Sequence, residues 1–263
     1  MSVLALRSIA GQCDRLILER GLGVVGDRHA RPGSPRQVLL VGDRALSEFK
    51  LQPGDLRENI LLPGDLTPFA SGQVWQLGAT ARLRLMFHCE PCQVLNRLRP
   101  GLATQIGRQR GWLAMVISSG TVQVGDRLSR CPPQFPSLSD RGADRFAEFV
   151  ARIPPGRIIR TPALLIALGL SAAYHRVIPT YLKQARPTLP RHRLIRADGR
   201  LFERYIAEQA ACLQAEGVLA IAGRLSTMQY DWSPAAFHAL DADPSQIAST
   251  GSPASSPGQT VYN

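Results

Sequence analysis

The feature that most constrains this chain is a change of sequence pattern at a proline-rich segment near its middle. Before that segment, apolar and polar residues alternate, as in 73–77 and 81–87, which is typical of half-buried β-strands. After it, apolar residues recur at helical spacing, as in 140–153. The segment 131–137 itself carries three prolines, which suits a linker. The sequence therefore predicts a multidomain α+β protein.

We expect four consecutive parts along the chain. These are a β-dominated, barrel-like domain at 1–131, a linker at 132–139, a helical domain at 140–240 and a disordered tail at 241–263. The first domain should contain short strands and helices, the strands over 37–41, 73–77 and 81–87 and the helices over 45–49 and 103–110. In the second we expect helices over 140–153, 161–168, 171–183 and 201–216 and a strand over 224–232. The helix pair 161–183, joined by a glycine-containing turn, is typical of a helix-turn-helix.

Charge and cysteine content narrow the partners and the compartment. The net charge is +11, and the stretch 157–200 holds nine basic side chains and one acidic side chain, which is typical of a protein that binds a polyanion. The five cysteines are unevenly spaced and do not form a disulfide pattern, which favours a reducing cytoplasm. No apolar run reaches the ~20 residues that span a bilayer, so no membrane partner is expected.

Five short motifs follow one another along the N-terminal half. They are Gly-Asp-Arg-His at 26–29, Arg-Gln-Val-Leu-Leu at 36–40, Arg-Glu-Asn-Ile at 57–60, Pro-Cys at 91–92 and Gly-Asp at 125–126. The glycines of 21–26 do not form a dinucleotide loop, because no strand precedes them and no helix follows. Together these segments resemble the MOSC (molybdenum cofactor sulfurase C-terminal) family over about residues 1–130. The resemblance implies a β-barrel-like fold and a site for the molybdenum cofactor (molybdopterin), used in sulfur carriage or in reducing N-hydroxylated substrates.

The resemblance assigns the molybdenum thiolate to Cys92, with Cys89 as its neighbour. A soft thiolate suits molybdenum, and arginine binds the cofactor's phosphate bidentately. The resemblance and this chemistry give catalytic roles to Cys92 and His29, the latter as an orienting group or proton donor. The expected cofactor-binding residues are Arg28, Arg36, Arg57, Asn59 and Cys89.

The same residues allow other interpretations. Cys89 and Cys92 could be half of a zinc site, although no second pair has the right spacing, or a dithiol redox pair, or two inert buried cysteines. His29 could make only a structural hydrogen bond. Asp27 and Asn59 could simply cap turns.

In the C-terminal half, the segment Pro190-Arg191-His192-Arg193-Leu194 follows the expected helix pair. With the closing Tyr230 and Trp232, it resembles the DNA-binding half of O6-alkylguanine-DNA alkyltransferases, and more closely the alkyltransferase-like proteins, over about residues 141–235. The transferases read Pro-Cys-His-Arg-Val there, so Arg191 takes the place of the acceptor cysteine. A permanently protonated guanidinium cannot accept an alkyl group as a thiolate does, so no alkyl transfer is expected at this position.

This second resemblance implies a winged helix-turn-helix that enters the minor groove and turns a damaged base out of the duplex. Arg176 matches the arginine that fills the vacated gap, and Thr161 replaces the tyrosine that helps rotate the nucleotide. The expected DNA contacts are Arg176, Lys183, Arg186, Arg191, His192, Arg193 and Thr161. Glu216 is expected to bind backbone amides. Alternatively, the basic residues could form a solvated face or bind phosphates without reading a lesion.

Two hypotheses for the whole chain follow. In the first, a molybdenum-dependent oxidoreductase with a separate electron donor reduces an N-oxygenated base in DNA that carries a damaged purine. In the second, a non-enzymatic protein recognises DNA lesions and recruits repair factors. A further possibility is that the C-terminal domain only dimerises or docks a partner.

Overall fold

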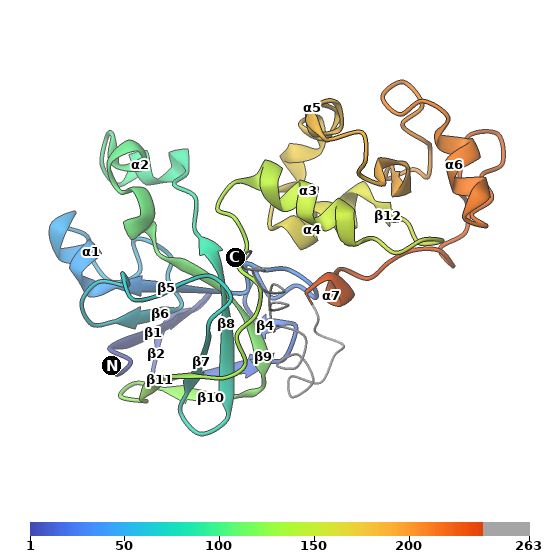
Figure 1. Ribbon diagram of the computed structural model, residues 1–263. Helices are drawn as coiled ribbons and strands as arrows, with labels where there is room; N and C mark the ends of the chain where they lie inside the picture. The colour runs from blue at the N-terminus through green and yellow to red at the C-terminus, as the bar shows by residue number, and fades with distance from the viewer. Residues whose placement is uncertain (239–263) are drawn as a thin grey trace, which may run out of the picture.

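The computed structural model describes residues 1–238, and the predicted tail at 241–263 lies outside them. A mostly β part, formed by the N-terminal half, lies beside a helical part formed by the rest of the chain (Figure 1). Within residues 1–238, no helix combines the length and the apolar character of a membrane span.

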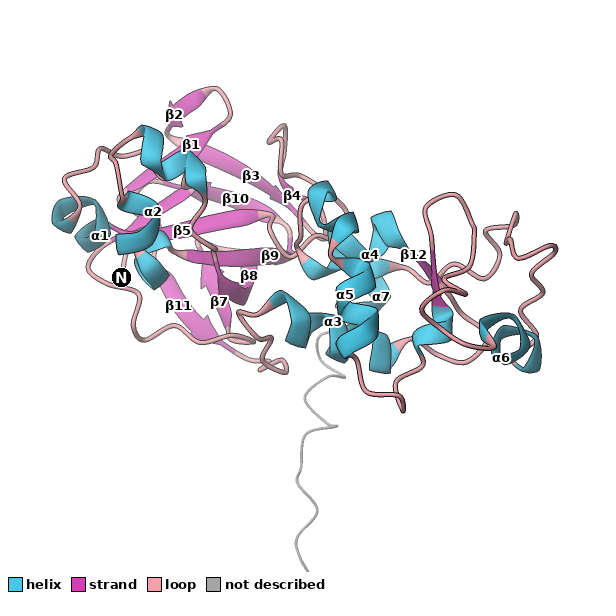
Figure 2. Cartoon of the chain, turned by 90° about the horizontal axis from the view of Figure 1, so that it is seen from above, coloured by secondary structure: helices cyan, strands magenta, loops and turns pink. Residues whose placement is uncertain are grey.

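The β part is built on a large, mostly antiparallel sheet. Its eight strands lie in the order β11-β7-β8-β9-β5-β6-β1-β2, and only β5 and β6 pair in parallel. Their bounds are Ala5–Ser8 (β1), Gly11–Cys13 (β2), Val38–Gly42 (β5), Ile60–Leu62 (β6), Val74–Leu77 (β7), Ala81–His88 (β8), Trp112–Ser118 (β9) and Leu128–Cys131 (β11). A second sheet orders β10 (Gly120–Gln123), β3 (Arg15–Glu19) and β4 (Gly23–Val24). Leu16 and Leu18 of this sheet share one buried cluster with Leu83 of the large sheet, so the two sheets enclose a common core (Figure 2).

The three strands predicted for the β part are confirmed, and its two predicted short helices are confirmed in part. Segments 73–77 and 81–87 form β7 and β8, as their alternating pattern predicts. Segment 37–41 forms β5, whose continuous apolar run is buried on both faces, with Val38 and Leu40 in one core cluster and Leu39 and Val41 in the other. The helix expected over 45–49 is α1 (Asp43–Glu48). The helix expected over 103–110 is divided into α2 (Leu102–Gln105) and a 3-10 turn, η2 (Gly107–Arg110). Gly107 adopts φ +50°, which interrupts the right-handed helix between them.

The helical part centres on α3 (Gly142–Arg152) and α4 (Thr161–Leu168). The predicted apolar face of α3 is confirmed, since Phe146 and Phe149 are buried. Helix α4 begins at Thr161-Pro162 and ends at Gly169 in the left-handed conformation, as the sequence predicts. The remaining elements are η3 (Ala172–Arg176), α5 (Ile178–Gln184), η4 (Arg191–Arg193), α6 (Gln209–Ala215), α7 (Pro234–Phe237) and the parallel pair β12 (Ile159–Arg160) and β13 (Leu194–Ile195), with η1 (Gln93–Arg97) in the β part.

Three predicted elements of the helical part are wrong in whole or in part. The helix expected over 171–183 is divided into η3 and α5, because Pro179 has no N–H to continue the hydrogen-bond ladder. The helix expected over 201–216 begins only at Gln209, after Glu208 turns the chain with φ +55°. The segment 224–232 is not a strand and makes only isolated bridges, such as Ile158 to Asp231.

The two parts share a core. One buried cluster contains Met86 and Phe87 of β8 together with Phe146 and Phe149 of α3. Gly169 allows this close approach, because a Cβ there would come within 2.8 Å of the Phe87 ring. Two side chains of the expected linker, Phe135 and Leu138, are also buried. The boundaries at 131 and 140 stay predictions, and the apolar packing runs across them.

Candidate functional site

The structure brings all seven residues of the predicted cofactor site together around one pocket of about 340 Å³. They come from the loop before β5, the turn before β6 and the segment after β8. The pocket is lined by Arg28, His29, Arg36, Leu39, Asp55, Arg57, Asn59, Cys89, Glu90, Cys92, Val94, Leu95, Arg97, Leu98, Arg110 and Leu113. Segments far apart in the sequence thus meet at this pocket.

The two cysteines of this pocket differ in accessibility. Cys92 is exposed at the start of η1 and its thiol is free. Cys89 is buried, and burial raises the pKa of its thiol although Arg110 and Arg36 favour the thiolate. The Arg36 guanidinium lies 3.5 Å from Cys89 Sγ. Cys92 is therefore the thiol that a ligand in the pocket can reach. Among residues 1–238, no group of three or more His, Cys, Asp and Glu side chains is arranged to hold a metal ion.

Arg110 is a charged pocket residue that was not predicted from the sequence. Its side chain is only 7% exposed, and its Nε and Nη1 atoms have no hydrogen-bond partner within the described part of the chain. A buried guanidinium without partners is costly unless an anion satisfies it. The η2 turn places Arg110 in the wall of the pocket that holds Cys92, and a bound anionic group there would remove this cost.

The rim of the pocket adds exposed cations. Arg57 adopts a left-handed backbone, φ +56°, which is unfavourable for a residue other than glycine and is common at functional sites. Within residues 1–238 its side chain has no ion-pair partner, and the same holds for Arg97. These unneutralised charges favour an anionic ligand.

His29 and Asn59 have defined polar contacts. Burial, followed by the charge of Arg28, lowers the pKa of His29, so its imidazole is neutral at pH 7. Arg28 Nε donates to His29 Nε2 at 3.0 Å, which leaves the imidazole proton on Nδ1. Asn59 accepts from the Leu39 amide at 2.9 Å and donates to Asp27 at 3.2 Å, so it fixes the turn and the loop to each other.

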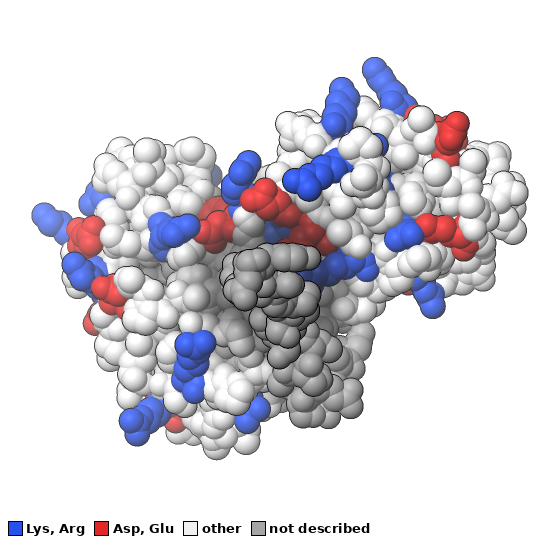
Figure 3. All heavy atoms as spheres, in the orientation of Figure 1, with Lys and Arg blue, Asp and Glu red and all other residues white. Residues whose placement is uncertain are grey.

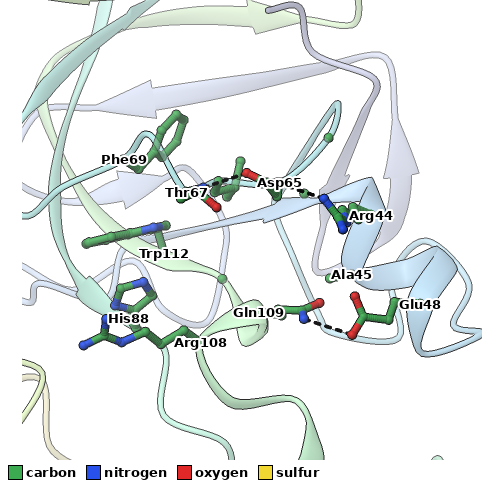
Figure 4. Close-up of a pocket in the computed structure, with 14 residues that line it drawn as sticks. Arg44, Ala45, Glu48, Asp65, Thr67, Phe69, His88, Arg108, Gln109 and Trp112 are labelled. Atoms are coloured by element: carbon green, nitrogen blue, oxygen red, sulfur yellow. Dashed lines mark hydrogen bonds and ion pairs between the residues drawn. The ribbon is translucent and has the colours of Figure 1, made fainter.

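A second cavity, of about 430 Å³, opens between α1, η2 and the end of β8 (Figure 4). Its charged groups are already paired. Arg44 bonds to Asp65 at 3.2 Å, and Gln109 donates to Glu48 at 3.1 Å. His88 packs against Trp112, with ring centroids 3.9 Å apart and ring planes inclined by 40°. Because its polar groups satisfy one another, this cavity makes a weaker case for a charged ligand than the Cys92 pocket.

The predicted DNA contacts fall into two sets. Arg176, Lys183 and Arg186 are exposed on η3, α5 and the loop after α5, and Figure 3 shows basic side chains projecting from the helical part. The other four make internal contacts. Thr161 is buried and donates to the Ile195 carbonyl at 3.1 Å, and Arg191 donates to the Leu182 carbonyl at 2.7 Å. His192 and Arg193 both bond to Glu216, at 2.8 Å and 2.5 Å.

Comparison with known proteins bears on the β part. A model of the MOSC domain matches residues 36–129. Residues 36–129 are a MOSC domain. No curated protein matches the chain.

Among solved structures, the chain is similar to YiiM from Escherichia coli, with 21% identity and a TM-score of 0.42 over 68% of this chain and 92% of that one. It is also similar to the YUAD protein from Bacillus subtilis, with 20% identity and a TM-score of 0.40 over 49% of this chain and 94% of that one. A further similarity is to S. pombe Atl1, solved with damaged DNA containing O6-carboxymethylguanine, at 24% identity and a TM-score of 0.33 over 37% of this chain and 99% of that one.

An ion-pair cluster, buried at Arg145 but partly exposed at Glu90, joins the MOSC domain to the helical part beside Cys92. Glu90 accepts from Arg36 at 2.5 Å and from Arg145 of α3 at 3.0 Å. Arg145 is 2% exposed and its guanidinium lies 3.7 Å from the centre of the Phe87 ring. Because Glu90 lies between Cys89 and Cys92 in sequence, the helical part helps to fix the cysteine segment of the MOSC domain.

Glu216 holds together the end of the helical part. It accepts from the Gly156 amide at 3.0 Å, which confirms the expected contact with the backbone. Burial opposes ionisation, but the hydrogen bonds from Arg193 and His192 outweigh it and lower the pKa of Glu216 to about 2. The folded carboxyl therefore stays ionised in acid that already protonates it in the unfolded chain.

We expect Glu216→Gln to destabilise the protein by about 1–3 kcal/mol at pH 7. In the wild type this contribution is present above the ordinary pKa near 4.5 and is lost as pH falls toward 2. Urea unfolding at pH 7, 4 and 3 measures it. Exposed Glu203→Gln is the matched control, and equal stability of the two variants at pH 7 contradicts the assigned role of Glu216.

Proposed function

We propose that the MOSC domain binds the molybdenum cofactor at the Cys92 pocket and that the helical part binds DNA, so that one chain acts on a damaged base. The observation that carries the first half is the buried, unpartnered Arg110 guanidinium beside the exposed Cys92 thiol. The MOSC family is associated with this cofactor. A pocket that offers one soft thiolate and several unneutralised arginines fits a thiolate-ligated, phosphate-bearing group.

The residues divide the binding among them. Cys92 would provide the thiolate ligand, and Arg57 and Arg110 would bind the phosphate. Arg36 is already engaged by Glu90, so its role is to hold the wall of the pocket. When bound, this cofactor supplies two-electron redox chemistry, while the protein supplies orientation.

We assign the substrate to the N-hydroxylated bases. Breaking the N–O bond of such a base consumes two electrons and two protons and releases water. The electrons come from a separate redox protein. His29 is the residue that can orient the substrate, because its neutral ring carries a hydrogen on Nδ1 that can be donated in a hydrogen bond at the pocket wall, while the two protons come from solvent.

Binding to DNA is supported by the exposed basic side chains of η3 and α5. Arg176, Lys183 and Arg186 have no ion-pair partner within residues 1–238, so they are free to contact phosphates. The other four expected contact residues make hydrogen bonds within the protein, so we assign phosphate binding to the three exposed residues. Thr161 is buried and donates to the Ile195 carbonyl, so no phosphate contact is assigned to it.

Metal analysis tests the cofactor half. Protein purified from molybdate-supplemented cells is expected to contain molybdenum, and Cys92→Ser is expected to lose at least nine-tenths of it because the hydroxyl is a poor ligand for a soft metal. Cys212→Ser, a half-buried cysteine of α6 outside the pocket, is the matched control. Equal molybdenum in wild type and Cys92→Ser removes the role assigned to Cys92.

Duplex binding and turnover test the second half. Matched duplexes with O6-methylguanine or guanine are compared across a salt series, where phosphate contacts give a steep salt dependence. Reductive action is tested on N6-hydroxyadenine, free and in DNA, with a chemical reductant. If loaded protein leaves both forms unchanged, the reductive assignment is wrong, and a preference for the lesion duplex then favours recognition without catalysis.

A further inference from the structure

The Cys92 pocket does not end at the MOSC domain. A groove of about 690 Å³ continues from it between the two parts of the chain and shares Arg28, Arg57 and Cys92 with the pocket. On its other wall lie the end of α4 and the start of η3, including Leu170 and Tyr174. The pocket and the groove therefore form one continuous path from Cys92 to the helical part.

At its far end the groove meets a third hollow. The two share Arg31 of the MOSC side and Ile166, Leu170 and Ala172 of the helical side. This third hollow is lined by Thr161 and His175, next to the exposed Arg176 of η3. The path thus begins at the surface predicted to bind DNA and ends at Cys92.

The groove carries an excess of positive charge. Its one acidic side chain within the described residues is Glu90, which two arginines already neutralise. Arg31 and Arg57 line the groove with no ion-pair partner in residues 1–238, and Arg28 bonds only to the neutral His29. An anionic ligand is the partner that this wall favours.

The opposite wall offers an aromatic ring. Tyr174 is 41% exposed although it is a large apolar side chain, and no aromatic contact covers it within the described part of the chain. Exposed aromatic rings flanked by cations are the elements that bind single-stranded nucleic acids, because bases stack on the ring while arginines contact the phosphates.

We propose that this groove is a binding site for an unpaired nucleotide of a DNA strand, with its base stacked on Tyr174 and its phosphates on Arg31 and Arg28. The size agrees, since cavities of roughly 300–1,000 Å³ hold ligands of nucleotide size rather than a duplex. The proposal rests on the proposed function, in which Arg176, Lys183 and Arg186 bind a DNA duplex. That duplex would release one unpaired base into the groove, which leads to Cys92.

The test uses the full-length protein and fluorescein-labelled oligonucleotides: a single-stranded 12-mer, its blunt duplex, and a duplex with one unpaired base. The single strand and the bulged duplex are expected to bind more tightly than the blunt duplex. Tyr174→Leu is expected to weaken single-strand binding about 5- to 100-fold, while Tyr174→Phe, which keeps the ring, stays within about 2-fold of wild type.

Arg31→Gln tests the phosphate contact. It should reduce the slope of log K against log salt by about 0.7, the value expected for one phosphate contact on a single strand. Arg127→Gln, an exposed arginine of the β part that does not line the groove, should leave the slope unchanged. A 5-iodouracil oligonucleotide is expected to photocrosslink to the peptide that contains Tyr174.

Wild-type affinity in Tyr174→Leu, or equal binding of the blunt duplex and the single strand, overturns the proposal. These readouts do not depend on molybdenum. If the groove variants lose binding but Cys92→Ser keeps its metal, the cofactor assignment fails and the groove stands. If Cys92→Ser loses its metal but Tyr174→Leu binds normally, the reverse holds.

Discussion

Replacing Arg145 by methionine is expected to destabilise the protein by about 2–4 kcal/mol. Arg145 donates to the carbonyls of Leu168, Ser139 and Asp140 at 2.8–3.0 Å, and to Glu90 at 3.0 Å. Methionine fills a similar volume but leaves these acceptors without this donor, and the contact with the Leu168 carbonyl is buried away from water. Chemical denaturation at pH 7 measures the loss.

The control is Arg141→Met, one helical turn earlier, where the guanidinium is 79% exposed and pairs with Asp144 at 3.9 Å. An exposed pair contributes little, so this change should cost less than about 1 kcal/mol. The double variant Arg145→Met, Glu90→Gln should lose less unfolding free energy than the two single variants summed. Each single variant already removes the ion pair between Arg145 and Glu90, and the double variant removes it only once. Additive costs would show that Glu90 and Arg145 act independently.

The protein should also lose stability in mild acid through His238. Burial, followed by the charge of Arg84, lowers the pKa of His238 to about 3, from an ordinary value of 6.5. The Nε2 of His238 donates to the Ala167 carbonyl at 2.9 Å, and Arg84 donates to the His238 backbone carbonyl at 2.9 Å. His238 is therefore protonated below about pH 6.5 in the unfolded chain but only below about pH 3 in the folded protein.

The expected loss is about 3 kcal/mol between pH 7 and pH 4. Urea unfolding at pH 7, 5.5 and 4 measures it. His238→Gln keeps an N–H donor and does not ionise, so this part of the pH dependence should disappear in that variant. His175→Gln, an exposed histidine of η3, is the control and should follow the wild type. Parallel curves for wild type and His238→Gln would refute the assignment.

The parts of the fold that the sequence predicts well are those that local chemistry determines. Helix α4 has the bounds that its Thr-Pro start and Gly169 end predict, and β7 and β8 follow their alternating side chains. One of the failures depends on distant contacts. Gln209 starts α6 late because its side chain bonds to the Phe202 amide and the Leu194 carbonyl, in place of the helical turns expected there.

The site likewise contains residues that local sequence motifs identify and residues whose role depends on the folded structure. The ordered motifs place Cys92, His29 and Arg57 around one pocket, and their roles there stay predictions. Arg110 carries no local signal, since its importance arises from a burial that only the assembled fold creates. Nor does the sequence show that Arg145, 55 positions after Glu90, bonds to it. The break between η3 and α5 is different, because Pro179 is a local signal that the helix expected over 171–183 does not take into account.

The shared core has a consequence for how the chain is synthesised. Met86 and Phe87 emerge from the ribosome with β8, but the side chains that cover them belong to α3 and α4, and Phe237 of α7 joins the same cluster. At about 5–20 residues per second, the roughly 100 residues between β11 and α7 take about 5–20 s to translate. During this interval the nascent MOSC domain presents an uncovered apolar face. We therefore expect it to be a client of ribosome-associated chaperones until α7 is released.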